Sequence, residues 1–242
     1  MIILNWNHCT QLIKFELRNT PFYKYLLNIG VAIIFGWLFA DILSNYFTES
    51  RSTPVIDMLL IIGISANSYM FRGYPFFLRE VNNNLYIAPI QIHLRQLPFS
   101  EKTLIVSRLL SGFIFSIMSS ISFIVILHIF LTTHHLAQIV SFSICWLMLV
   151  LSSSSFVTAA EPGSAMTKFY ATFWTFFIVF LFFGASTLIQ RITGHYFFEW
   201  YLIGTKEAPL LLTIIILVLS LLLFRLSLYY MNKYLSETDY HI

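Results

Sequence analysis

The sequence has little charge. Asp, Glu, Lys and Arg make up 10% of its 242 residues, whereas soluble globular domains carry roughly 25%. Hydrophobic residues make up 58%, and the mean hydropathy is +0.78. A soluble surface needs more charge than this, but a surface that faces lipid does not. The composition excludes an ordinary soluble domain and predicts an all-α integral membrane protein.

The sequence also lacks the common signatures of metal binding and hydrolysis. Its two cysteines, Cys9 and Cys145, lie far apart in the predicted topology, which favours two free thiols over a disulfide or a metal pair. The His134–His135 pair has no carboxylate or thiolate nearby to complete a metal site. No H-E-x-x-H or G-x-S-x-G pattern occurs. We therefore expect no catalytic residue, no metal and no cofactor in this chain.

The sequence contains no G-x-x-x-x-G-K-[ST] loop, and its nine glycines are scattered. The chain therefore cannot cradle ATP by that route, and any ATP and Mg²⁺ would bind to a partner chain. The net charge of +3 is spread between apolar segments and forms no basic run, so no nucleic-acid partner is expected. The N-terminal stretch lacks the pattern of a cleavable signal peptide, and we expect the first span to act as the insertion signal.

Long apolar runs dominate what is present. Residues 1–21 form an amphipathic pattern, with Ile2, Trp6, Cys9, Ile13 and Leu17 on one face, which predicts an interfacial elbow helix. Residues 22–242 then predict a domain of six transmembrane helices in contact with membrane lipid. The predicted spans are about 22–43, 55–71, 104–131, 139–160, 169–189 and 210–230.

The basic residues predict the orientation of these spans. Eleven of the fourteen Lys and Arg residues fall on one side of the predicted topology, and the other three are Arg51, Arg191 and Lys206. Positive charge is retained on the cytoplasmic side. Both termini and the long loop 72–103 are therefore predicted to be cytoplasmic, in what we expect to be a bacterial cytoplasmic membrane.

The loop 72–103 carries two short patterns, Arg79-Glu80 and Leu97-Pro98-Phe99-Ser100. Pro98 favours an extended residue before it, and Ser100 is a good N-cap for a helix that begins at Glu101. The third span is thus predicted to begin at a defined boundary, with Arg108 two turns inside it.

With these patterns, the elbow helix and six spans, the chain resembles the permease subunits of ABC transporters in the type-2 exporter family. The resemblance implies a dimer of permease subunits, homodimeric or heterodimeric, and an ABC ATP-binding partner subunit. It also implies that the segment near Phe77 to Ile90 forms a coupling helix that docks on that partner. The residues implied in coupling are Phe77, Arg79, Glu80, Leu85, Tyr86, Leu97, Pro98 and Ser100.

Two further groups of residues are candidates within the spans. Ionisable and polar groups are costly in a membrane, so Asp57, Asn67 and Ser153 are candidates for a translocation path, although Asp57 is also placed to reach the outer surface. Small residues at four-residue steps let helices approach closely. Gly112, Ser116 and Ser120 therefore predict a packing seam, either within the subunit or at the dimer axis.

The sequence leaves two functions open. The first is an exporter permease that moves a hydrophobic or amphipathic cargo, such as an antimicrobial peptide (bacteriocin), a drug or a lipid-like compound, while a partner hydrolyses ATP. The alternative is an ATP-independent secondary transporter or channel that uses Asp57 and Asp41 as proton or cation groups. An intramembrane enzyme has no catalytic constellation in its favour.

Overall fold

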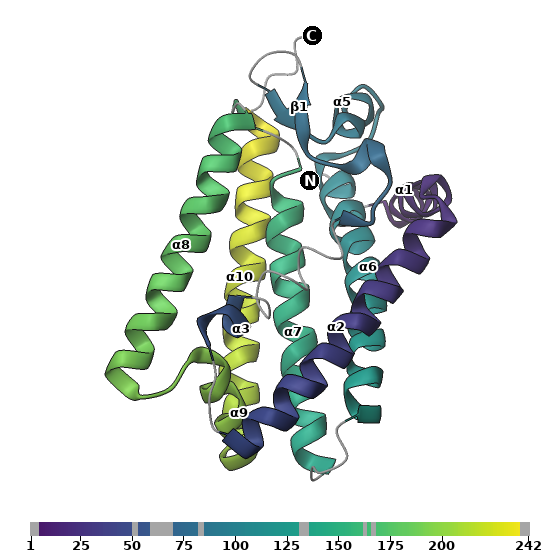
Figure 1. The fold of residues 1–242 in the computed structure, drawn as a ribbon. Helices are drawn as coiled ribbons and strands as arrows, with labels where there is room; N and C mark the ends of the chain where they lie inside the picture. The colour runs from purple at the N-terminus through teal and green to yellow at the C-terminus, as the bar shows by residue number, and fades with distance from the viewer. Residues whose placement is uncertain are drawn as a thin grey trace.

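The computed structural model describes residues 5–49, 53–58, 70–81, 85–130, 136–161, 164–165 and 168–237. The fold is a helical bundle with a small sheet at one end (Figure 1). The longer helices are α1 (Trp6–Asn19), α2 (Phe22–Glu49), α6 (Glu101–Phe130), α7 (Leu136–Ala159), α8 (Lys168–Thr193), α9 (Phe197–Glu207) and α10 (Pro209–Glu237). The short helices are α3 (Pro54–Met58), the 3₁₀ turn η2 (Tyr74–Phe76) and α5 (Pro89–Arg95).

Five of the described helices, α2, α6, α7, α8 and α10, are long and apolar enough to cross a membrane. Many of their large apolar side chains are exposed, which suits contact with lipid rather than water. This is the architecture of a multi-pass membrane protein. Of the predicted span 55–71, the structure describes α3 at its start and residues 70–71 at its end, and the rest lies outside the described residues.

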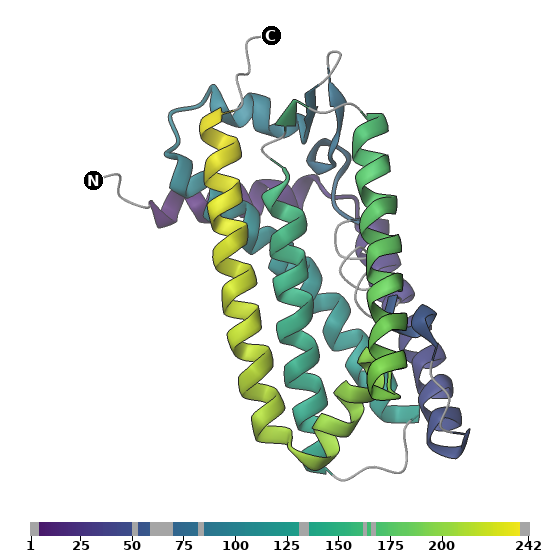
Figure 2. The same cartoon turned by 90° about the vertical axis from the view of Figure 1, so that its left-hand side faces the viewer.

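The predicted elbow helix is present as α1, which runs across the bundle axis and packs on α6 (Figure 2). The side chain of Asn5 caps it by accepting hydrogen bonds from the backbone NH groups of Asn7 (3.1 Å) and His8 (3.3 Å). The predicted apolar stripe is buried in part: Cys9 is buried, and Ile13 and Leu17 are half-buried, whereas Trp6 is 60% exposed. The charged residue Glu16 is buried as well and lies beside this stripe.

The bundle is centred on α6 and α7. Helix α2 packs against α6, and α7 packs against both α6 and α10. One apolar core, which includes Phe39, Phe123, Trp146 and Phe198, lies towards the end of the bundle that carries α9, and Phe123 stacks on Trp146 at 4.6 Å between ring centroids. A second core, around Leu109, joins α6, α7 and α10 near the sheet. Among the five membrane-length helices α8 is the least buried, with 6% of its most apolar stretch buried, and its main contacts are with α3 and α9.

The segment predicted as a coupling helix is not helical over most of its length, and that part of the prediction is wrong. Strands β1 (Arg79–Val81) and β2 (Leu85–Ile87) pair antiparallel, and β2 also pairs with β3 (Ser164–Ala165) from the connection between α7 and α8. The helix begins at Pro89 instead, as α5. Pairing with a strand about 80 residues later in the chain stabilises β2, and a local reading of the sequence does not see that partner.

We call residues 72–81 and 85–98, which include η2, β1, β2 and α5, together with β3 the end block. The start of α1 and the end of α10 lie at the same end of the molecule as this block, whereas α9 lies towards the opposite end (Figures 1 and 2).

Candidate functional site

Four charged side chains meet beneath the end block. Glu16 of α1 accepts hydrogen bonds from Nε of Arg72 (2.7 Å) and Nη1 of Arg108 (2.6 Å). Glu161, just after α7, accepts from Nε of Arg108 (2.6 Å) and from Nη1 of Arg72. Two carboxylates and two guanidiniums therefore alternate around a closed arrangement, which we call the charge ring.

The charge ring is removed from water, since none of its four residues is more than 2% exposed. Burial by itself would raise the pKa of Glu16, but the guanidiniums of Arg108 and Arg72 beside it outweigh that effect and hold the pKa below its ordinary value. The Phe76 ring covers Arg108, 4.8 Å from its guanidinium carbon. The two charges of each sign cancel within the ring, which is the condition under which buried ions are tolerated.

Further hydrogen bonds, most of them to backbone carbonyls, attach the end block to the helices around the charge ring. Nζ of Lys24 donates to the carbonyl of Arg72 (2.5 Å), and the NH of Ala88 donates to the carbonyl of Glu161 (3.2 Å). From α5, Arg95 donates to the carbonyl of Leu235 near the end of α10 and pairs with Glu101 at 3.3 Å. The end block is thus attached to α1, α2, α6, α10 and the end of α7.

Local sequence explains how α6 contributes to the ring. The hydroxyl of Ser100 accepts a hydrogen bond from the backbone NH of Thr103 (3.3 Å), and α6 begins at Glu101, so the predicted cap is confirmed. This start places Arg108 two turns into the helix, on the face that packs against α1.

The residues predicted to couple with an ATPase gather in or beside the end block. Glu80 is exposed on β1, and Leu97 and Pro98 are exposed after α5. Phe77 lies 4.7 Å from Nζ of Lys24, and the guanidinium of Arg79 lies 4.7 Å from the Tyr74 ring centroid. Leu85 and Tyr86 lie on β2, where the structure describes the backbone. Ser100 is occupied by its capping role.

The predicted packing seam lies within the subunit. A Cβ on Gly112 would come within 3.0 Å of Oγ1 of Thr158 and 3.3 Å of Oγ of Ser154, both on α7. Ser116 and Ser120 are fully buried on the same helix. Gly112 therefore allows α6 to approach α7 closely.

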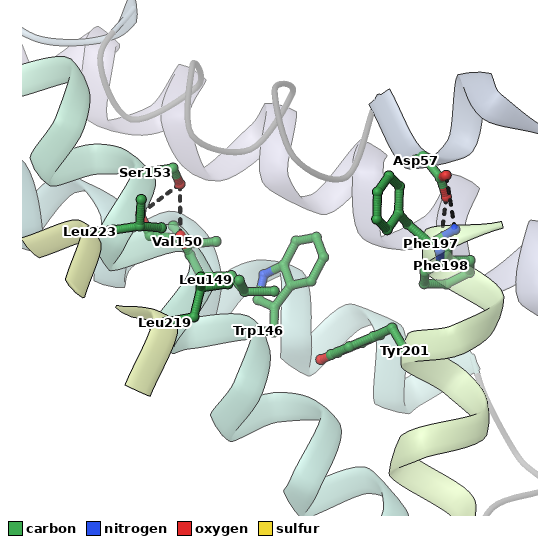
Figure 3. Close-up of a pocket in the computed structure, with 10 residues that line it drawn as sticks. All are labelled: Asp57, Trp146, Leu149, Val150, Ser153, Phe197, Phe198, Tyr201, Leu219 and Leu223. Atoms are coloured by element: carbon green, nitrogen blue, oxygen red, sulfur yellow. Dashed lines mark hydrogen bonds between the residues drawn. The ribbon is translucent and has the colours of Figure 1, made fainter. Parts of the chain in front are cut away.

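Two of the three predicted path residues line one cavity of about 320 Å³ between α7, α9 and α10 (Figure 3). Asp57 and Ser153 lie towards opposite ends of it, with Trp146 between them. Asn67 lies outside the described residues. Asp57 is not a free carboxylate: it accepts hydrogen bonds from the backbone NH groups of Phe197 (3.1 Å) and Phe198 (2.9 Å) and from the Ser186 hydroxyl.

Sequence reasoning missed Glu16 and Glu161 and treated Arg72 and Arg108 as orientation signals. The sequence did contain a signal for this cluster. Charges are few in this chain, and two acidic and two basic residues lie near the ends of apolar segments on the predicted cytoplasmic side. Buried charges in such a chain require partners of opposite sign.

Comparison of the chain with protein-family models, with curated proteins and with solved structures found no match.

Proposed function

We propose that this chain is the membrane-spanning permease subunit of an ATP-driven ABC exporter. In this proposal six spans cross a bacterial cytoplasmic membrane, both termini and the end block face the cytoplasm, and the permease works as a dimer with a separate ATP-binding subunit. The cargo is hydrophobic or amphipathic, because the spans offer mainly Phe, Leu and Ile.

One observation carries the proposal, namely the charge ring. An extramembrane block needs no buried four-charge attachment if it only connects two spans. A block that receives force from a partner must move together with the helices that it drives, and the ring attaches it to α1, α6 and the end of α7 through bonds of 2.6–2.7 Å. The exposed Glu80, Leu97 and Pro98 give that block a contact surface on its outer side.

Copurification tests the proposal. The tagged full chain, expressed in its own host and solubilised with ATP hydrolysis blocked, is expected to bring down a protein with a phosphate-binding loop. Leu97→Arg on the end block is expected to reduce that recovery because it places a charge on a 47% exposed apolar contact residue. Lys206→Glu, on the exposed surface of α9, is the control and should leave recovery unchanged. Failure of the wild-type chain to recover any ATPase counts against the proposal.

The alternative of an ATP-independent transporter has one observation in its favour, the position of Asp57 at the cavity. Its carboxylate, however, is already used to hold the start of α9. Asp41, the other acidic group of that hypothesis, lies exposed on α2 rather than at the cavity. Transport driven by a proton gradient without ATP, and abolished by Asp57→Asn, would favour this alternative over the exporter.

A further inference from the structure

The described residues that line the cavity between α7, α9 and α10 offer almost no polar atom to a ligand. Asp57 accepts three hydrogen bonds from the protein, the Ser153 hydroxyl donates to backbone carbonyls of its own helix (2.8 and 3.1 Å), and the Tyr201 hydroxyl donates to the carbonyl of Phe142 (2.7 Å). Among the polar side-chain atoms of the lining residues, the indole nitrogen of Trp146 has no partner within the described part of the chain, and it is itself shielded from the surface.

A ligand with many polar groups would lose its hydrogen bonds to water in this cavity and regain none, which costs several kcal/mol by transfer measurements. A peptide backbone or a sugar is therefore a poor occupant. Hydrocarbon has no such loss, and the remaining lining residues are aliphatic or aromatic: Leu149, Val150, Phe197, Phe198, Leu219 and Leu223.

The position of the cavity gives hydrocarbon access to it. Its lining residues on α7 and α10 lie near the middle of two helices that are long enough to cross a membrane. Trp146, Val150 and Phe198 are buried, whereas Leu219 is 47% exposed and Leu223 is half-buried. The cavity is therefore lined by buried side chains on the inside and bordered by residues that face the bilayer interior, where the surrounding medium consists of acyl chains.

We infer that this cavity binds one acyl chain of a bilayer lipid, which lies against the Trp146 ring. The volume of about 320 Å³ holds roughly ten methylene groups, if each takes the ~30 Å³ of a water molecule in the liquid. An engineered cavity of about 150 Å³ already binds benzene. This binding site does not depend on the proposed transport function.

Fluorescence quenching by brominated lipid tests the site. Trp146 is kept as the single tryptophan by replacing Trp6, Trp37, Trp174 and Trp200 with Phe. The purified full chain is reconstituted in phosphatidylcholine bilayers, with or without bromine near the ends of the acyl chains. Bromine quenches an indole on contact, and Trp146 is 3% exposed, so lipid outside the bundle barely reaches it. We expect a loss of Trp146 fluorescence comparable to that of a tryptophan in direct contact with bulk lipid.

The reference is Leu221→Trp in a chain whose five native tryptophans are replaced by Phe. Leu221 is 59% exposed on α10 and lies between Leu219 and Leu223 in sequence, so it reports lipid contact at a similar depth. Quenching of Trp146 at background level, with the reference strongly quenched, would overturn the inference.

A second comparison fills the cavity. Ser153→Phe is expected to remove most of the quenching of Trp146, whereas Val125→Phe, at a 49% exposed position on α6, is expected to leave it unchanged. Equal quenching in the two variants would show that the brominated acyl chain reaches Trp146 by a route outside the cavity, and it would reject the inference. Circular dichroism and elution volume establish that each variant folds, and Leu223→Phe replaces Ser153→Phe if the latter does not.

Discussion

The charge ring depends on the chemistry of arginine. A guanidinium presents several NH donors in one plane, so Arg72 and Arg108 can each bridge both Glu16 and Glu161. Lysine offers a compact point charge on a flexible stem and would not reproduce this bridging geometry. The four side chains thus form a unit, and removal of one member affects the other three.

Removal of a single charge from the ring should be strongly destabilising. Glu161→Gln leaves two buried guanidiniums facing one carboxylate, and breaking a buried ion pair in this way costs about 3–5 kcal/mol. Glu101→Gln removes the carboxylate of a surface pair with Arg95, at a side chain 55% exposed, and should cost less than about 1 kcal/mol. Thermal unfolding of the detergent-solubilised protein measures both changes. Similar unfolding temperatures for the two variants would contradict a structural role for the ring.

The lowered pKa of Glu16, which lies on α1 outside the membrane-spanning segments, predicts acid sensitivity. A carboxyl whose pKa is lower in the folded protein stabilises the fold above its ordinary value of 4.5, and this contribution is lost as pH falls from that value through the folded pKa. Acidification from neutral pH should therefore lower the unfolding temperature below roughly pH 4.5. Glu16→Gln should be less stable at neutral pH and lose less stability on acidification. A variant with the acid dependence of the wild type would show that other groups cause it.

At the level of elements, close contact between helices depends on positions that lack a side chain. A Cβ on Gly36 of α2 would lie 2.9 Å from the carbonyl oxygen of Phe123 on α6, whereas a Cβ on Gly30 of the same helix would meet nothing within 4 Å. Helix α2 therefore packs against α6 through one of these two glycines.

Alanine substitution separates the two positions. Gly36→Ala should force α2 and α6 apart and cost about 1–3 kcal/mol, as in other overpacked cores. Gly30→Ala should be neutral or more stable by up to ~1 kcal/mol, since alanine favours the helix. Unfolding temperatures and the yield of monodisperse protein measure the difference. Equal stability of Gly36→Ala and Gly30→Ala would contradict the close contact between α2 and α6 at Gly36.

The start of α9 depends on a residue from another element. The carboxylate of Asp57, on α3, accepts hydrogen bonds from the backbone NH groups of Phe197 and Phe198. A hydrogen bond to a charged acceptor contributes about 1.5–3 kcal/mol to stability. Asp57→Ala should therefore speed hydrogen exchange of these two amides by roughly tenfold or more, as measured by mass spectrometry on peptides that cover α9. Asp41→Ala, at an exposed position on α2, serves as the control. Unchanged exchange in Asp57→Ala would mean that α9 needs no support from α3.

At the scale of the whole molecule, the end block and α9 lie at opposite ends of the bundle (Figure 1). Both native cysteines are buried, so the wild-type chain offers little background to a thiol reagent. With an impermeant maleimide on intact cells, Lys206→Cys on α9 should be labelled and Glu80→Cys on β1 should be labelled only after the membrane is opened. Labelling of Glu80→Cys in intact cells would place the end block outside and remove the basis for coupling to cytosolic ATP.

The sequence alone determined the features that depend on neighbouring residues. Apolar runs of membrane length become helices in any apolar setting because their backbone groups bond within the segment, and five such helices are present. The start of α6 was predictable for the same reason, since Ser100 caps the helix that follows it directly.

Tertiary structure decided the features whose partners are distant in sequence. Glu16 meets residues 56 and 92 positions later, and β2 pairs with residues that follow α7. The sequence shows a charge or a short apolar run at each of these places but not its partner. Arg72 and Arg108 were therefore interpreted as orientation signals, and nothing in the local sequence corrected the helix that the family resemblance implied near Phe77 to Ile90. A buried charge is stable only beside its counter-charge, and a three-residue strand only beside its neighbour. Folding of the whole chain is what brings those partners together.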